Sequence, residues 1–148
     1  KTTLELFRNT SNVTFNVKWP HENKVFIHAD KEQINGIFSN LIKNGIQAIP
    51  QDRDGVIKVE LKVTGDKVLV SVADNGSGIP EALRNRMFTP NFTTKSSGTG
   101  LGLSIAKRYA EGAGGRIWFE SQTGRGATFF VEFPLKYTVE KPGEAKSE

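Results

Sequence analysis

The spacing of hydrophobic residues changes several times along the chain, and each spacing indicates a different element. Alternating apolar and polar residues predict strands at 13–19, 24–28, 56–63, 67–73, 116–121 and 127–135. Short turns rich in glycine join the middle two and the last two of these strands. We therefore expect two antiparallel hairpins.

Helical spacing is clearest between Asp30 and Pro50. Apolar side chains and one glycine recur there at intervals of three and four residues, and they are Ile34, Ile37, Phe38, Leu41, Ile42, Gly45, Ile46 and Ile49. Asp30 is placed to cap the first turn, and Pro50 closes the helix. Shorter helices are expected at 81–87, with Pro80 at the first helical position, and at 101–111.

Helices interleaved with hairpins predict an α/β fold, namely a two-layer α/β sandwich with a mixed, mostly antiparallel sheet packed against about three helices. A chain of 148 residues is long enough for one core. We expect a single domain over residues 1–139. The charged segment 140–148 is expected to be a disordered tail.

Composition excludes several classes of function. The chain has no cysteine and only two isolated histidines, which argues against disulfides and against a zinc site. The net charge is +4, but the basic residues are scattered among acidic ones, so we expect no nucleic-acid partner. No apolar run approaches the roughly 18 residues of a membrane span. We expect a cytoplasmic fragment, whose parent protein could still carry a membrane anchor.

The segment Asp74-Asn-Gly-Ser-Gly78 follows a predicted strand. Asp74 shares a strand face with three valines, and a carboxylate on an apolar face needs hydrogen-bond donors. An adenine amino group and a water would supply them. A hairpin turn at Asn75-Gly76 is the alternative, but the segment leads into a helix start. Gly76 and Gly78 would let the backbone approach a flat ligand closely.

A second glycine cluster, Gly98-Thr-Gly-Leu-Gly-Leu103, leads into the helix predicted at 101–111. Helix starts offer unpaired N–H groups, and glycines let backbone wrap closely around phosphate oxygens. The spacing fits neither the Walker loop nor the dinucleotide fingerprint. Taken alone, the cluster is explained equally well as a flexible linker.

Two further features could serve a nucleotide. Asn40 and Asn44 share one flank of the helix 30–50, and the carbonyl oxygen of Asn44 could ligate Mg²⁺. Amides at a solvent boundary explain the helix pattern equally well. Residues 88–97 have no apolar period and are typical of a lid, in which Lys95 would bring positive charge to a terminal phosphate. A loop without function is the alternative.

Taken together, these segments resemble the ATP-binding catalytic domain of two-component sensor histidine kinases. Sensor histidine kinases share this domain with a superfamily that also includes gyrase, chaperone and mismatch-repair ATPases. The resemblance covers roughly residues 25–135 and is strongest to the nitrogen-regulation branch. The matching motifs stand in the family's order, and they are NLIKNGIQAI, DNGSGIP, MFTPNFTTK, GTGLGLSIAKRY and TGRGATFFVEFP.

The resemblance implies ATP and Mg²⁺ as ligands and assigns a role to each matching residue. The adenine side would be formed by Asp74, Gly76, Gly78, Ile79 and Thr128. The phosphate side would be formed by Gly98, Thr99, Gly100, Leu101, Gly102 and Leu103. Asn44 would hold the metal, and the catalytic set would be Asn40, Asn44 and Lys95.

Asn40 decides which reaction we expect. The ATPase branches carry a glutamate at this position, where it activates water, and an amide cannot act as a general base near neutral pH. We therefore expect transfer of the γ-phosphoryl group rather than hydrolysis. His21 and His28 lie outside any long helix, so neither is expected to accept the phosphoryl group.

The resemblance also implies the expected partners, because neither histidine of this chain is expected to accept the phosphoryl group. They are the helical phosphoacceptor and dimerisation domain of the parent chain and a downstream response regulator. The fragment is expected to be a monomer and the parent a homodimer. Two alternatives stay open: an ATPase or serine-directed kinase of the same fold, and a non-catalytic nucleotide-sensing or interaction module.

Overall fold

The computed structural model describes residues 2–10, 12–20, 23–90 and 102–140. Its main sheet has five strands in the order β1-β3-β4-β6-β5. The strands are β1 (Val13–Lys18), β3 (Gly55–Thr64), β4 (Lys67–Asp74), β6 (Gly126–Pro134) and β5 (Arg116–Gln122). The β1–β3 pair is parallel and the other pairs are antiparallel. The predicted mixed, mostly antiparallel sheet is confirmed.

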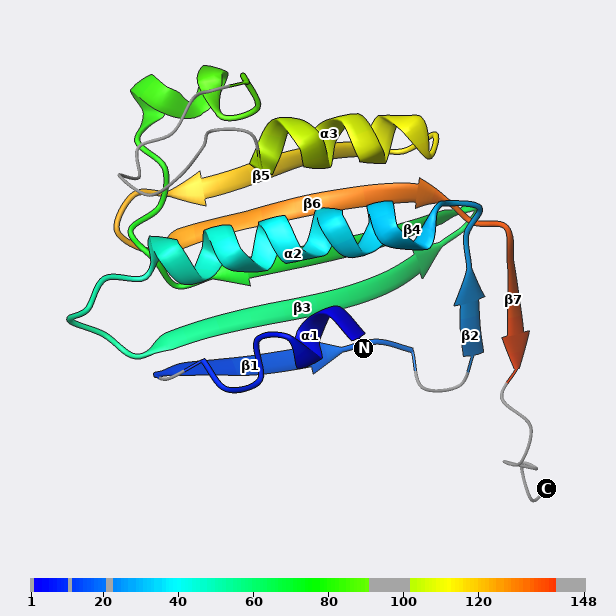
Figure 1. The fold of residues 1–148 in the computed structure, drawn as a ribbon, viewed down its shortest axis with the longest axis horizontal. Coiled ribbons are helices and arrows are strands. Elements are labelled where there is room, and N and C mark those ends of the chain that lie inside the picture. Colours follow the sequence, from blue (N-terminus) through cyan, green and yellow to red (C-terminus); the bar gives the residue numbers. More distant parts are fainter. Residues whose placement is uncertain (1, 11, 21–22, 91–101, 141–148) are drawn as a thin grey trace.

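Helices cover one face of this sheet (Figure 1). The long helix α2 (Lys31–Ala48) begins as predicted, because the carboxylate of Asp30 accepts a hydrogen bond from the Gln33 N–H at 3.0 Å. Helix α3 (Gly102–Gly112) packs beside it. The short helix η1 (Glu81–Arg86) is a 3₁₀-helix, and Pro80 occupies its N-cap position rather than its first helical position. A four-residue helix, α1 (Thr2–Glu5), was not predicted.

The hydrophobic core lies between the helices and the sheet. The apolar face of α2 supplies Ile37, Leu41 and Ile42, each at most 1% exposed. The sheet supplies Ile57, Val72, Phe129, Val131 and Phe133. Full burial of each such side chain contributes roughly 1.5–3 kcal/mol. The core therefore fixes α2 rigidly over β4 and β6.

A second, two-stranded sheet pairs β2 (Asn23–Phe26) with β7 (Tyr137–Glu140). The rings of Phe26 and Tyr137 stack across it with centroids 4.7 Å apart. The sequence predicted a strand near β2 but not β7. The segment 140–148 was predicted to be a disordered tail, but Glu140 is the last residue of β7, and residues 141–148 lie outside the described residues. Within the described ranges, no helix has the length and apolar character needed to cross a membrane.

Candidate functional site

Asp74 ends β4 on the face that the helices cover. Val68, Val70 and Val72, which share that face, are all buried. Oδ1 of Asp74 accepts hydrogen bonds from the N–H groups of Gly76 at 2.8 Å and Ala127 at 3.4 Å. Backbone donors from the loop after β4 and from the start of β6 therefore hold one oxygen of the carboxylate.

The other carboxylate oxygen lies toward α2, at the level of Gly45. A methyl group on Gly45 would be 3.4 Å from Cβ and 3.7 Å from Oδ2 of Asp74, and 3.1 Å from Cδ1 of Ile57. Glycine at this position therefore keeps side-chain atoms out of the space between α2 and Oδ2. The two sides of this space are thus set by a helix and a strand that the core holds in place.

Gly76 and Gly78 are both packed against backbone of other segments of the chain, which the sequence did not reveal. A methyl group on Gly76 would be 2.5 Å from the carbonyl oxygen of Ala48. Gly78 has φ +76° and lies against the backbone of Gln122. The close approach is therefore to the protein's own backbone, and approach to a flat ligand stays a prediction.

Ile79 anchors the end of this loop in the core. Its side chain is 8% exposed and belongs to the core cluster. Its N–H donates to Oγ of Ser121 at 2.7 Å, and its carbonyl oxygen accepts from Nε of Arg84 at 3.1 Å. Ile79 is thus fixed relative to β5 by side-chain and backbone contacts.

The amide residues of α2 lie where the helical pattern predicted. Asn40 and Asn44 are half-buried and follow one another by one helical turn. A methyl group on Gly102 would be 3.3 Å from Oδ1 of Asn40, so this amide lies against the start of α3. One helix therefore carries the amides, faces Asp74 at Gly45 and contacts the start of α3.

The second glycine cluster is described only in part. Gly102 is the first residue of α3, and Leu103 is half-buried and packs against the core. The start of this helix presents backbone N–H groups and the positive end of the helix dipole. The predicted residues Lys95, Gly98, Thr99, Gly100 and Leu101 lie outside the described residues.

The side chains of Thr128 and Asp74 lie on opposite faces of the sheet. Thr128 pairs with Ala73 on β4, while Phe129 pairs with Val72. Paired residues in an antiparallel sheet point to the same face, and neighbours along a strand point to opposite faces. Thr128 therefore points away from the helices, and Ala127 is the β6 residue next to Asp74. Every second residue of β6 is buried, namely Ala127, Phe129, Val131 and Phe133. The alternation in the sequence could therefore have indicated which face Thr128 takes.

Asn75 was also missed as a supporting residue. Its Oδ1 accepts from the N–H of Val56 at 2.8 Å, and its Nδ2 donates to the carbonyl oxygen of Asp54 at 2.9 Å. These bonds fix the loop after β4 to the start of β3. From the sequence, Asn75 was interpreted only as a turn residue, because its hydrogen-bond partners Asp54 and Val56 belong to another segment.

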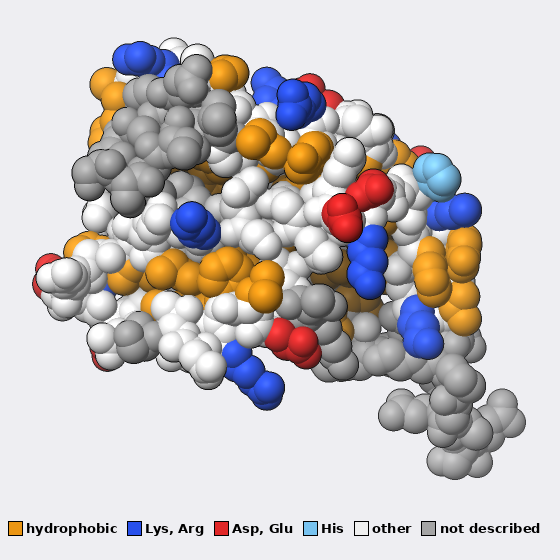
Figure 2. All heavy atoms as spheres, in the orientation of Figure 1, with side chains coloured by type: hydrophobic (Ala, Val, Ile, Leu, Met, Phe, Trp, Pro, Cys, Tyr) orange, Lys and Arg blue, Asp and Glu red, His pale blue; other side chains and the backbone are white. Residues whose placement is uncertain are grey.

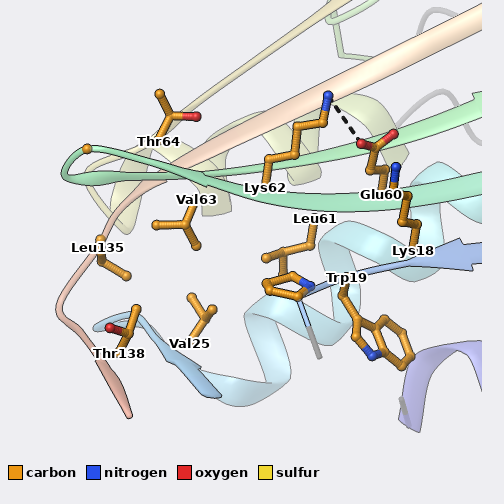
Figure 3. A pocket seen from close by; sticks show the side chains of 12 residues that line it. Lys18, Trp19, Val25, Glu60, Leu61, Lys62, Val63, Thr64, Leu135 and Thr138 are labelled. Carbon is orange, nitrogen blue, oxygen red and sulfur yellow. Dashed lines mark ion pairs between the residues drawn. The ribbon is translucent and has the colours of Figure 1, made fainter. Parts of the chain in front are cut away.

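A separate groove of 590 Å³ lies at the opposite end of β3 (Figure 3). Its lining includes Trp19, Val25, Leu61, Val63 and Leu135, with lysines and a glutamate at its rim. None of the predicted nucleotide-binding residues lines it. On the face drawn in Figure 2, Lys and Arg side chains are scattered among uncharged and acidic ones.

Several known proteins are similar to this chain in sequence and in fold. Residues 29–137 match the family described as histidine kinase-, DNA gyrase B-, and HSP90-like ATPase. Sporulation kinase C of Bacillus subtilis (strain 168) is 35% identical over 126 residues, which are 85% of this chain and 29% of that protein. Sensor histidine kinase ZraS of Escherichia coli (strain K12) is 42% identical over 116 residues, or 78% of this chain and 24% of that protein.

A solved catalytic domain of histidine kinase ThkA has a TM-score of 0.79 and 36% identity, covering 90% of this chain and 88% of that one. The chain therefore belongs to the family of histidine kinase-, DNA gyrase B- and HSP90-like ATPases, and its fold is that of a histidine kinase catalytic domain. It spans 29% and 24% of the lengths of the two curated relatives named above.

Proposed function

We propose that the chain is the catalytic domain of a sensor histidine kinase, which binds Mg²⁺ and ATP and donates the γ-phosphoryl group to a histidine on a separate domain. The proposal rests on one arrangement. Helix α2 faces the Asp74 carboxylate at Gly45 and contacts the start of α3 at Asn40. A carboxylate, two amides and a helix start are thereby gathered along a single helix.

The adenine end of the site would be formed by Asp74. The amino group of adenine would donate to this carboxylate, which backbone N–H groups of Gly76 and Ala127 orient through Oδ1. Guanine carries a carbonyl oxygen at the corresponding position, and a carboxylate repels such an acceptor. Gly76, Gly78 and Ile79 would shape the loop that holds the carboxylate.

The phosphate end would be formed at the start of α3. Backbone N–H groups and the helix dipole favour phosphate oxygens at a helix start. Gly102 and Leu103 would supply backbone donors from the helix, and Gly98, Thr99, Gly100 and Leu101 from the preceding segment. Lys95 would add positive charge near the terminal phosphate.

The half-buried amide of Asn44 fits a magnesium ion. In the part of the chain that the structure describes, no three His, Cys, Asp or Glu side chains gather into a metal site. A single amide oxygen suits Mg²⁺, which takes most of its remaining ligands from phosphates and waters. When bound, the ion would neutralise charge on the phosphates.

Asn40 favours phosphoryl transfer over hydrolysis. Its amide cannot remove a proton from water near neutral pH, and it lies against the start of α3, where the terminal phosphates would be bound. The nucleophile would be a histidine on the helical phosphoacceptor domain of a homodimeric parent. The phosphoryl group would then pass to a response regulator. A solved structure of histidine kinase ThkA in complex with response regulator protein TrrA, whose matching chain is 32% identical to this one, supports a response regulator as a partner.

A transfer assay tests the proposal. The chain is incubated with γ-labelled ATP and Mg²⁺, with and without the phosphoacceptor domain of the parent. We expect labelled histidine only when both proteins are present. Asn44→Ala should abolish labelling, whereas Gln47→Ala, an exposed amide on the same helix, should leave it intact. Steady ATP hydrolysis that the acceptor domain does not change would contradict the proposal.

A further inference from the structure

We infer that Arg53 is a positioning residue for the Asp74 carboxylate, and through it for the adenine base. Arg53 lies in the turn between α2 and β3, which no motif described above includes. In Figure 1 this turn, the end of β4 and the β5–β6 turn lie at the same end of the sheet. The inference rests on the proposed function, because it concerns how the same carboxylate recognises its ligand.

One nitrogen of Arg53 meets three backbone carbonyl oxygens. Its Nη1 donates to Asn75 at 3.1 Å, to Gly76 at 3.4 Å and to Gly124 at 3.3 Å. The first two acceptors belong to the loop after β4, and the third belongs to the β5–β6 turn. A guanidinium in the α2–β3 turn therefore ties together two loops that meet at Asp74.

The contact with Asn75 reaches Asp74 through one peptide unit. The carbonyl group of Asn75 and the N–H group of Gly76 belong to the same planar amide. The carbonyl oxygen accepts from Arg53, and the N–H donates to Oδ1 of Asp74 at 2.8 Å. A cation on the oxygen polarises the amide and strengthens its N–H as a donor. Arg53 therefore acts on the bond that orients the carboxylate.

The hydrogen bond from Arg53 to Gly124 links Arg53 to Asp74 through the β5–β6 turn. The N–H of Gly124 donates to the carbonyl oxygen of Ser77 at 2.6 Å, which joins the two loops directly. Three residues later, the N–H of Ala127 donates to Oδ1 of Asp74 at 3.4 Å. The Gly76 donor thus lies in a loop that Arg53 contacts, and the Ala127 donor lies near the start of β6, just after the turn that Arg53 contacts.

Arg53 contributes to local geometry more than to global stability. Its side chain is 36% exposed, and its ion pair is with Asp52, whose side chain is 77% exposed. Such exposed pairs contribute little. Without the guanidinium, water could satisfy carbonyl groups at this partly exposed site, so the fold would persist while both loops lose their common anchor.

Calorimetric titration of this chain with ADP and with a non-hydrolysable ATP analogue, both with Mg²⁺, tests the inference. We expect Arg53→Ala to weaken both ligands by the same factor, about tenfold. An equal factor is expected because the base is common to both ligands. Arg53→Lys should recover part of the affinity, since an ammonium group keeps the charge but not the planar fork.

Arg125→Ala is the matched control, because it removes the same charge from an exposed position in the β5–β6 turn. It should bind both ligands as the wild type does. Amide hydrogen exchange of the unliganded protein should quicken at Gly76 and Gly124 in Arg53→Ala, with the melting temperature within a few degrees of wild type.

Three results would overturn the inference. The first is unchanged affinity in Arg53→Ala, and the second is a loss confined to the ATP analogue, which would place Arg53 at the phosphate end. The third is an equal loss in Arg125→Ala, which would reduce the effect to net charge. A wild-type chain that binds neither nucleotide would instead refute the proposed function, and the inference with it.

Discussion

Asn40 on α2 and Gly102 at the start of α3 lie so close that a methyl group on Gly102 would be 3.3 Å from Oδ1 of Asn40. The contact joins two segments separated by strands β3 and β4 and by η1. It places an uncharged amide next to the N–H groups of a helix start. In the proposed function, this is where the terminal phosphates bind.

Replacing Gly102 should therefore affect the phosphates and spare the base. We expect Gly102→Val to weaken a non-hydrolysable ATP analogue about tenfold, because the side chain would displace Asn40 or the first turn of α3. Adenosine affinity, measured by NMR titration, should stay within about twofold of wild type. Gly112→Val is the matched control in the same helix, since a methyl group there meets nothing within 4 Å.

Two substitutions of Gly45, to valine and to alanine, test how much space the base needs beside α2. Gly45→Val should weaken adenosine and ATP alike, by about tenfold or more, because a branched side chain would crowd Oδ2 of Asp74 and Cδ1 of Ile57. Gly45→Ala needs the Ile57 side chain to move by only a few tenths of an ångström. Calorimetry should find the alanine variant close to wild type, and equal losses in both variants would contradict this reading of the space.

A substitution of Thr128 tests whether its hydroxyl belongs to the proposed adenine site. Thr128→Val keeps the shape and removes the hydroxyl. Because Thr128 points to the face of the sheet away from Asp74, we expect nucleotide affinity to stay within about twofold of wild type. A tenfold loss of nucleotide affinity in calorimetric titration would show that this hydroxyl contributes to the site.

A pair of leucines tests the packing of α2. Leu41 is 1% exposed in the core, and Leu6 is 73% exposed. Leu41→Ala should lower the free energy of unfolding by about 2–5 kcal/mol in urea denaturation, through lost burial and a cavity. Leu6→Ala should change it by less than about 1 kcal/mol. Similar changes in both variants would mean that α2 does not pack on the sheet as described.

Sequence patterns predicted the elements that carry strong local signals. Helix α2 combines a long apolar stripe, the cap residue Asp30 and a final proline, so its bounds were predicted within one or two residues. The hairpins β3–β4 and β5–β6 combine alternation with glycine turns. Strand β7 was missed because it has four residues, and its partner β2 stands more than a hundred positions earlier in the chain.

Predictions about the site were incomplete where they needed register or a distant neighbour. The family motif around Thr128 suggested a hydroxyl at the adenine site, but only the pairing with Ala73 reveals which face Thr128 takes. The glycines after Asp74 were interpreted through a ligand, yet Gly76 meets the backbone of Ala48. Arg53 carries no sequence signal, because its three acceptors are backbone carbonyls.

The central claim is that the Asp74 carboxylate recognises adenine. Calorimetric titration with a non-hydrolysable ATP analogue and Mg²⁺ tests it most directly, comparing wild type, Asp74→Asn and the exposed control Asp66→Asn. The account predicts saturable binding by wild type and by Asp66→Asn, and a loss of about a hundredfold in Asp74→Asn, which lacks the carboxylate acceptor. An Asp74→Asn protein that binds as tightly as wild type would contradict it.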